Sequence, residues 1–229
     1  EYFDNMNKRR TVCANDSVML DWQVNVQEAL RSHPVLVCCC MVPAQQLKCM
    51  EQCPDASLVL SDSMDKWLRR QPELLDAVIS RSHITMMNED EAKEYAGAST
   101  ILEAGEFLLS RGATYAVVKQ GEYGATLIGR EKDGRTRIFR CPAYPLKTLV
   151  DPTGAGDTFL GALAGYLSTL PEGLPSFEDM KRGIVYGTVA ASFTCESFSA
   201  DALLSMTPET FRGRLAEYTE MCSIPAACN

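Results

Sequence analysis

A chain of 229 residues is long enough for one domain with a sizeable core, and 46% apolar with 23% charged residues is ordinary for a globular protein in water. Its 22 basic and 30 acidic residues give a net charge of −8, which argues against nucleic acid or an anionic membrane as a partner. No apolar run approaches the roughly 20 residues that cross a bilayer, and no signal-peptide pattern is visible.

Strands and helices are expected to alternate from residue 35 onward. The expected strands are 35–42, 58–61, 83–87, 115–119, 125–128 and 136–140. The expected helices are 43–52, 64–80 with a break at Pro72, 88–97, one capped by Ser99 that ends near Ser110, 154–170, 176–195 and 207–221. This alternation predicts a single three-layer α-β-α domain of the α/β class, with a mostly parallel sheet covered by helices on both faces.

Residues 1–34 are polar and mixed, and only short strands at 11–13 and 17–20 and a turn of helix at 24–30 are expected there. Three of the ten cysteines, at 38–40, lie in the apolar run 35–42, which we interpret as a buried strand that uses Cys as a small hydrophobe. No set of cysteines has the spacing of a disulfide scaffold or a four-ligand zinc site, so we expect reduced thiols and a cytoplasmic protein.

Residues 151–159 read Asp-Pro-Thr-Gly-Ala-Gly-Asp-Thr-Phe and precede an apolar helix. The turn Gly154-Ala155-Gly156 has almost no side chains, so its N–H groups can approach a ligand, and the helix dipole adds positive potential for a phosphate. Asp157 would repel an anion there, unless it accepts a proton from a hydroxyl that attacks a bound phosphoryl group. A capped tight turn that binds nothing is the alternative, and the residues alone leave both open.

Two other stretches follow expected strands, the position at which open α/β sheets bind ligands. Asn88 and Glu91 follow the strand 83–87 and open a helix; an N-terminal cap with acidic residues on the helix dipole is the alternative interpretation. Residues 119–124, Lys-Gln-Gly-Glu-Tyr-Gly, combine a strand end with a glycine turn, which is a weak signal by itself.

Together these motifs resemble those of the ribokinase-like (PfkB) carbohydrate and nucleoside kinases, in the same order and over about residues 35 to 221. The sequence resembles uncharacterised bacterial sugar-kinase-like members of that family. The resemblance implies a ribokinase-like fold and transfer of the γ-phosphate of Mg-ATP to a hydroxyl of a sugar or nucleoside. In that family the Gly-Ala-Gly backbone is an anion hole and the final Asp is the general base, roles that fall on Gly154, Ala155, Gly156 and Asp157.

The resemblance also implies nucleotide and magnesium contacts. Asn88 and Glu91 match an Asn-x-x-Glu motif that orders magnesium and phosphate-bound water, with Glu91 acting on Mg²⁺ through water. Gly121 and Gly124 match a Gly-x-x-Gly turn that lies against the ATP phosphates, and Lys119 is expected as a phosphate contact.

Asp151 and Thr153 stand where several members of the family coordinate potassium. The alternative is that Asp151 only accepts N–H bonds of the turn. Ala190 and Ala191 are expected on the helix that flanks the adenine in the family, although a small helix face at this spacing also suits close helix packing.

The family's N-terminal strands, its Gly-Gly turn over the substrate and much of its lid have no counterpart in the sequence, which begins with Glu1 rather than Met. We therefore expect a piece of a longer protein, with 1–34 a remnant of the lid and substrate region and 35–229 the nucleotide-binding and catalytic core. Lids pair between subunits in this family, which makes a homodimer an expectation. A non-catalytic nucleotide- or metabolite-binding domain is the alternative function, and the sequence does not name the acceptor.

Overall fold

Six strands form one sheet in the order β1-β2-β3-β4-β5-β6, and the computed structural model describes residues 21–131 and 133–223. The strands are β1 Val35–Cys38, β2 Leu58–Asp62, β3 Ile84–Asn88, β4 Tyr115–Lys119, β5 Ala125–Arg130 and β6 Thr136–Cys141. The first four run parallel, whereas β5 and β6 each run antiparallel to the preceding strand. The parallel part therefore brings four carboxyl ends together at one end of the sheet.

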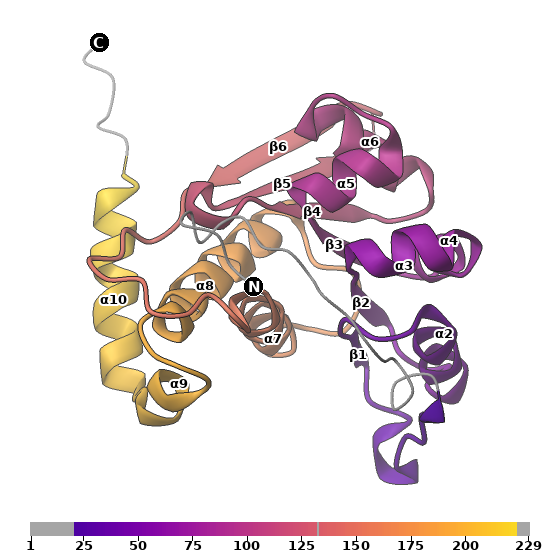
Figure 1. The fold of residues 1–229 in the computed structure, drawn as a ribbon, viewed down its shortest axis with the longest axis horizontal. Helices are drawn as coiled ribbons and strands as arrows, with labels where there is room; N and C mark the ends of the chain where they lie inside the picture. The colour runs from indigo at the N-terminus through magenta and orange to yellow at the C-terminus, as the bar shows by residue number, and fades with distance from the viewer. Residues whose placement is uncertain (1–20, 132, 224–229) are drawn as a thin grey trace.

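Helices cover both faces of this sheet (Figure 1). One face carries α2 Pro43–Gln52, α3 Asp65–Arg70, α4 Pro72–Ser80, α5 Glu89–Ala96 and α6 Ile101–Ser110. The other face carries α7 Ala155–Leu167 and α8 Phe177–Cys195, and α9 Asp201–Ser205 and α10 Pro208–Met221 pack against α8. Two 3₁₀ turns, η1 Glu28–Leu30 and η2 Gly121–Tyr123, lie in connections. The predicted three-layer α/β fold with a mostly parallel sheet is confirmed.

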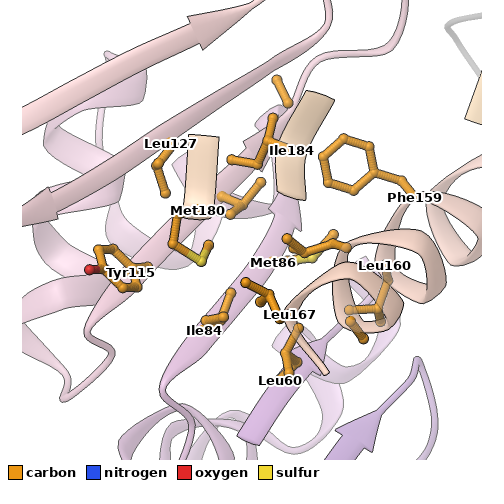
Figure 2. Packing of buried hydrophobic residues seen from close by; sticks show 14 of the residues in the cluster. Leu60, Ile84, Met86, Tyr115, Leu127, Phe159, Leu160, Leu167, Met180 and Ile184 are labelled. Atoms are coloured by element: carbon orange, nitrogen blue, oxygen red, sulfur yellow. The ribbon is translucent and has the colours of Figure 1, made fainter. Parts of the chain in front are cut away.

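Alternate residues of each strand enter different hydrophobic cores, because successive side chains of a strand point to opposite faces. The strand residues on the α7–α8 side include Leu58, Leu60, Ile84, Met86, Tyr115 and Val117. Figure 2 shows several of them beside Phe159 and Leu160 of α7 and Ile184 of α8. Val59, Met87, Ala116 and Val118 enter the cores on the opposite side. Burial on both faces explains why these strands read as continuous apolar runs.

The strand predicted over 35–42 is shorter than expected, since β1 ends at Cys38. Cys38 is fully buried as a small hydrophobe, but Cys39 is exposed and Cys40 is half-buried. The side chain of Gln46 explains the early end: its Nε2 donates to the carbonyl oxygens of Cys38, Cys39 and Asp62 at 3.2, 2.9 and 2.9 Å. The Gln46 side chain therefore takes the place of the backbone hydrogen bonds between β1 and β2 at the point where the two strands separate.

The helix cap predicted at Ser99 is wrong by one residue. The side chain of Thr100 accepts the N–H of Glu103 at 3.2 Å, and Oε2 of Glu103 accepts the N–H of Thr100 at 3.1 Å. This reciprocal capping box satisfies two donors at the start of α6, which the Ser99 side chain does not do.

The turn of helix predicted over 24–30 is limited to η1. The backbone before η1 is hydrogen-bonded to side chains of α2. The N–H of Val24 donates to Oε1 of Gln45 and the N–H of Val26 donates to Oε1 of Gln52, each at 2.9 Å. The break at Pro72 is confirmed, whereas α9 was not expected. The strands predicted at 11–13 and 17–20 lie outside the described residues.

No helix in the described part of the chain is both long and apolar enough to span a membrane. The eight cysteines at described positions are all free thiols.

Candidate active site

The turn before α7 takes the left-handed conformation that its glycine allows. Gly154 is the N-cap of the helix with a φ of +82°, a region that side chains with a Cβ rarely adopt. The N–H of Ala155 donates to the carbonyl oxygen of Pro152 at 3.1 Å. The other N–H groups of the first turn of α7 are at the positive end of the dipole, where helices leave amides without intrahelical partners. Asp157 lies in this first turn and is exposed, so its carboxylate is open to a ligand held at the amides.

The end of α8 anchors this turn. The N–H groups of Val150 and Asp151 point to the carbonyl oxygen of Cys195, at 2.8 and 3.4 Å, and the hydroxyls of Thr158 and Thr194 lie 2.8 Å apart. Phe159 is buried directly behind the turn. The turn is therefore attached to a rigid helix pair rather than to a free loop.

Asp151 closes the turn on itself. Its Oδ1 accepts the N–H of Thr153 at 2.9 Å, and hydrogen bonds from the side chain and backbone of Thr153 hold the pKa of the Asp151 carboxyl below its ordinary value. This is the bonding expected if Asp151 only satisfies the turn. A potassium contact for Asp151 and Thr153 stays a prediction.

Three of the parallel strands have a polar residue as their last residue, on the face of the sheet that α7 covers. Asp62, Asn88 and Lys119 come two residues after Leu60, Met86 and Val117, which face α7 and α8. The Lys119 ammonium forms an ion pair with Oδ2 of Asp62 across the intervening strand β3. A Cβ atom placed on Gly156 would be 3.2 Å from Nζ of Lys119, so the ammonium lies against the glycine turn.

Charge accumulates around this ammonium. Burial alone would lower the pKa of Lys119, but the carboxylate of Asp62, and after it those of Glu91 and Asp157, raise it above its ordinary value. Burial raises the pKa of the Cys39 thiol, and the charges of Asp157 and Asp62 raise it further. The Cys39 thiol and the Lys119 ammonium are therefore both protonated at neutral pH, which leaves carboxylates as the proton acceptors.

Asn88 and Glu91 form the N-terminal cap of α5. Oδ1 of Asn88 accepts the N–H of Glu91 at 2.8 Å, and Oε2 of Glu91 accepts the N–H of Asn88 at 3.1 Å. The capping interpretation is thus correct as local geometry. Glu91 is also 4% exposed, and its charge acts on Lys119 and on Cys40, whose pKa is raised to about 12 chiefly by burial. Its carboxylate therefore belongs to the same cluster as Asp62 and Lys119.

The glycine turn after β4 is tightly packed. Gly121 and Gly124 have φ of +56° and +92°, and a Cβ atom on Gly124 would lie 1.9 Å from the carbonyl oxygen of Cys141. Gln120 ties the turn to its surroundings, because its Oε1 accepts the hydroxyl of Thr126 at 2.7 Å and its Nε2 donates to Glu89 at 3.0 Å. The turn thus lies beside the helix that Asn88 begins.

Ala190 and Ala191 belong to the packed side of α8. Ala190 is 4% exposed, and Ala191 is partly buried against the main core. Their role beside an adenine stays a prediction, while close helix packing describes their surroundings.

Sequence reasoning missed Asp62 and Cys39. The sequence contained a signal for Asp62, which follows the apolar run 58–61. Because strand side chains alternate between the two faces of a sheet, Asp62 and Lys119 are each expected on the same face as the strand residue two positions before. Cys39 was expected inside a strand, whereas it lies just after the end of β1, where the charges of Asp157, Asp62 and Lys119 act on its thiol.

Comparison with known proteins identifies the family of this chain. The family model for pfkB family carbohydrate kinases matches residues 5–206. Cytidine kinase of Thermococcus kodakarensis is 32% identical over 147 residues, which are 62% of this chain and 49% of that protein. Mouse ribokinase is 34% identical over 118 residues, 49% of this chain and 35% of its own length.

Solved structures share the fold. Ribokinase from Giardia lamblia has a TM-score of 0.66 at 17% identity, with 83% of this chain and 62% of that one covered. Aminoimidazole riboside kinase from Salmonella enterica has a TM-score of 0.64 at 24% identity, with coverage of 80% and 64%. The chain thus spans about half or less of the relatives compared by sequence and under two thirds of these structures. By the match over most of its length, it belongs to the pfkB family of carbohydrate kinases.

Proposed function

We propose that this chain is the nucleotide-binding and catalytic part of a kinase that transfers the γ-phosphate of Mg-ATP to a hydroxyl of a sugar or nucleoside. The observation that carries the proposal is the exposed carboxylate of Asp157 in the first turn of α7, next to a glycine turn with an ammonium group against it. An anion-binding turn and a proton acceptor are what phosphoryl transfer to an alcohol requires.

Each part of the turn has a role in that reaction. The backbone N–H groups of Gly154, Ala155 and Gly156, with the helix dipole, stabilise negative charge on the transferred phosphoryl group, which shares the N–H of Ala155 with the carbonyl oxygen of Pro152. The ammonium of Lys119 adds a fixed positive charge at the same place. Asp157 accepts the proton of the attacking hydroxyl, and its exposure leaves room for that hydroxyl to approach.

Magnesium is expected to enter with the nucleotide, since Mg²⁺ usually keeps several waters and takes one or two carboxylates plus substrate phosphates. When bound, it neutralises charge on the phosphates. Glu91 fits this group as a buried carboxylate near Lys119, and it would act through water because one of its oxygens already accepts the N–H of Asn88. Gly121, Gly124 and Asn88 would hold the remaining phosphates.

The sugar or nucleoside would meet the site from the side of Asp157. Residues 1–34 are proposed to belong to the lid and substrate region, and 35–229 to the core. One relative is named a cytidine kinase, one a ribokinase and one an aminoimidazole riboside kinase, so the acceptors to test first are cytidine, ribose and an aminoimidazole riboside. A cytoplasmic location, a homodimer and stimulation by K⁺ at Asp151 and Thr153 complete the proposal.

The deciding experiment compares Asp157→Asn with the unmodified full-length gene product on this acceptor panel. We expect turnover to fall by at least about a thousandfold, because the amide cannot accept the proton and general-base catalysis with correct positioning is lost. Binding of Mg-ATP should survive. Asp201→Asn is the matched control, because Asp201 is also an exposed aspartate in the first turn of a helix, but in α9.

Unchanged turnover in Asp157→Asn would contradict the role of the base. Tight ATP binding by the unmodified protein without phosphorylation of any acceptor would favour the alternative, a non-catalytic nucleotide-binding domain.

A further inference from the structure

Asp62 has no role in the reaction described so far, yet it occupies a costly position. It is 4% exposed at the carboxyl end of β2, and its Oδ1 accepts the N–H of Ser63 at 2.9 Å while Oδ2 pairs with Lys119. A carboxylate removed from water is strongly unfavourable without a cation and hydrogen bonds, and a buried pair adds little net stability compared with apolar residues. The pair therefore calls for an explanation other than stability.

The place of Lys119 supplies one. Its Nζ lies against Gly156, at the positive end of the α7 dipole, where a cation is disfavoured unless negative charge is near. Two other carboxylates act on this ammonium, Glu91 and Asp157. Of these, Asp157 is the exposed one, and on the proposed function it must stay free to accept a proton.

We propose that Asp62 is a positioning residue that holds the Lys119 ammonium against the glycine turn and away from Asp157. The inference rests on the proposed function and deepens it. Three consequences follow from the geometry. The ammonium already lies at the phosphate position before the nucleotide binds, so little side-chain entropy is lost on binding. The general base keeps an unpaired carboxylate. The arriving γ-phosphate then shares the ammonium with Asp62, so the cation does not have to leave its partner.

The geometry explains why Asp62 can hold the ammonium in place where a surface residue could not. Asp62 is the last residue of β2 and Lys119 is the last residue of β4, and β3 lies between these two strands. Register and parity thus fix both side chains on the α7 side of a rigid sheet. A site held by strands positions a charge more accurately than one held by loops.

The test measures the preference for ATP over ADP, a readout that does not depend on turnover. In the full-length gene product, titration calorimetry gives the ratio of the two affinities in the presence of Mg²⁺. We expect Lys119→Met to lower this ratio at least about tenfold, the effect of one charge-assisted hydrogen bond to the γ-phosphate. Asp62→Asn should lower it by roughly three- to tenfold, since the ammonium is present but no longer held there. An unchanged ratio in Asp62→Asn overturns the inference.

A purely structural pair predicts a different pattern. The double variant Asp62→Leu, Lys119→Met replaces both charges with apolar groups, which removes the unpaired buried charge of either single variant. If the pair only stabilised the contact between β2 and β4, the double variant would recover both its thermal stability and its preference for ATP over ADP. That result would refute the positioning role. Positioning predicts regained stability with the preference still lost.

The control is Asp76→Asn, which breaks the pair of Asp76 with Arg111 on the opposite face of the sheet. It should leave the ATP preference unchanged, and a drop as large as that of Asp62→Asn would show that the loss is not specific to the site. Turnover on the acceptor panel separates the two proposals. A lowered ratio in Asp62→Asn, with no acceptor phosphorylated by the unmodified protein, would keep the inference and reject the proposed function.

Discussion

Gly187 of α8 lies so close to Phe159 of α7 that a Cβ atom on Gly187 would be 2.9 Å from the carbonyl oxygen of Phe159. Phe159 follows Asp157 by two residues and is buried behind the glycine turn. The two helices therefore pack tightly directly behind the proposed catalytic turn. The position of Asp157, the proposed general base, depends on how closely α7 and α8 pack.

We predict that Gly187→Ala lowers the free energy of unfolding by about 1–3 kcal/mol, the usual cost of overpacking, because the added methyl group meets backbone that cannot move alone. Turnover should fall as well, since α7 must shift. The matched control is Gly165→Ala, in the interior of α7, where a Cβ atom would meet nothing within 4 Å. That change should be neutral or stabilising, because Ala is the better helix former. Urea denaturation checks both, and equal losses in the two variants would contradict the packing argument.

A second prediction uses Cys39 as a probe for the charge of Asp157. Cys39 is exposed as a residue, but partial burial of its side chain and then the charge of Asp157 raise the pKa of the thiol, so little of it is the reactive thiolate at neutral pH. Asp157→Asn removes that charge, which should lower the thiol pKa and speed alkylation of Cys39 at pH 8 by roughly two- to fivefold. Lys119→Met removes a charge that lowers the pKa and should slow the reaction.

Site-resolved mass spectrometry of a timed reaction with iodoacetamide measures these rates. Cys222, exposed at the end of α10, serves as the internal control and should react at the same rate in all three proteins. Equal Cys39 rates in the unmodified protein and Asp157→Asn would show that the carboxylate does not face the end of β1.

The two glycines Gly97 and Gly124 separate strain from close contact. Both have positive φ, +61° and +92°, but a Cβ atom on Gly97 meets nothing within 4 Å, whereas one on Gly124 would overlap the carbonyl oxygen of Cys141. Gly97→Ala should cost about 1–2 kcal/mol of stability, the penalty for a left-handed residue with a Cβ. Gly124→Ala should cost more and weaken ATP binding, because η2 and β6 must move apart. Denaturation and ATP titration of both variants test this, and a smaller stability loss in Gly124→Ala would contradict it.

The elements that residue patterns predicted correctly are those in which local sequence preferences and burial agree. The run 58–61 and the strand 115–119 are buried on both faces. Pro43 and Pro72 begin helices, at a position where the missing N–H of proline costs no hydrogen bond. The errors lie where a distant side chain decides. Gln46 ends β1 early, and no pattern in 35–42 contains that information.

The candidate site shows the same division. The glycine turn and Asp157 are adjacent in sequence, so a motif of nine residues already indicates them. The pair of Asp62 with Lys119 joins residues 57 apart, and it depends on the order of the strands as well as on their parity. Parity could be counted from the sequence, but strand order required the structure.

The last prediction concerns acid stability and His83, which precedes β3. Its Nδ1 accepts the N–H of Val59 at 2.9 Å, and burial lowers the pKa of His83 below its ordinary value of 6.5. The unfolded chain therefore takes up a proton near pH 6.5, while the folded chain does so only at lower pH. Stability should be complete above pH 6.5 and fall as the pH drops from there toward the lowered pKa.

His83→Asn keeps a hydrogen-bond acceptor near the position of Nδ1 but has no group that titrates in this range. We expect its free energy of unfolding in urea to change less between pH 7.5 and 5.5 than that of the unmodified protein. His33→Asn, at the exposed histidine before β1, should retain the full pH dependence. If His83→Asn lost as much stability on acidification as the unmodified protein, another group would have to be responsible for the proton uptake.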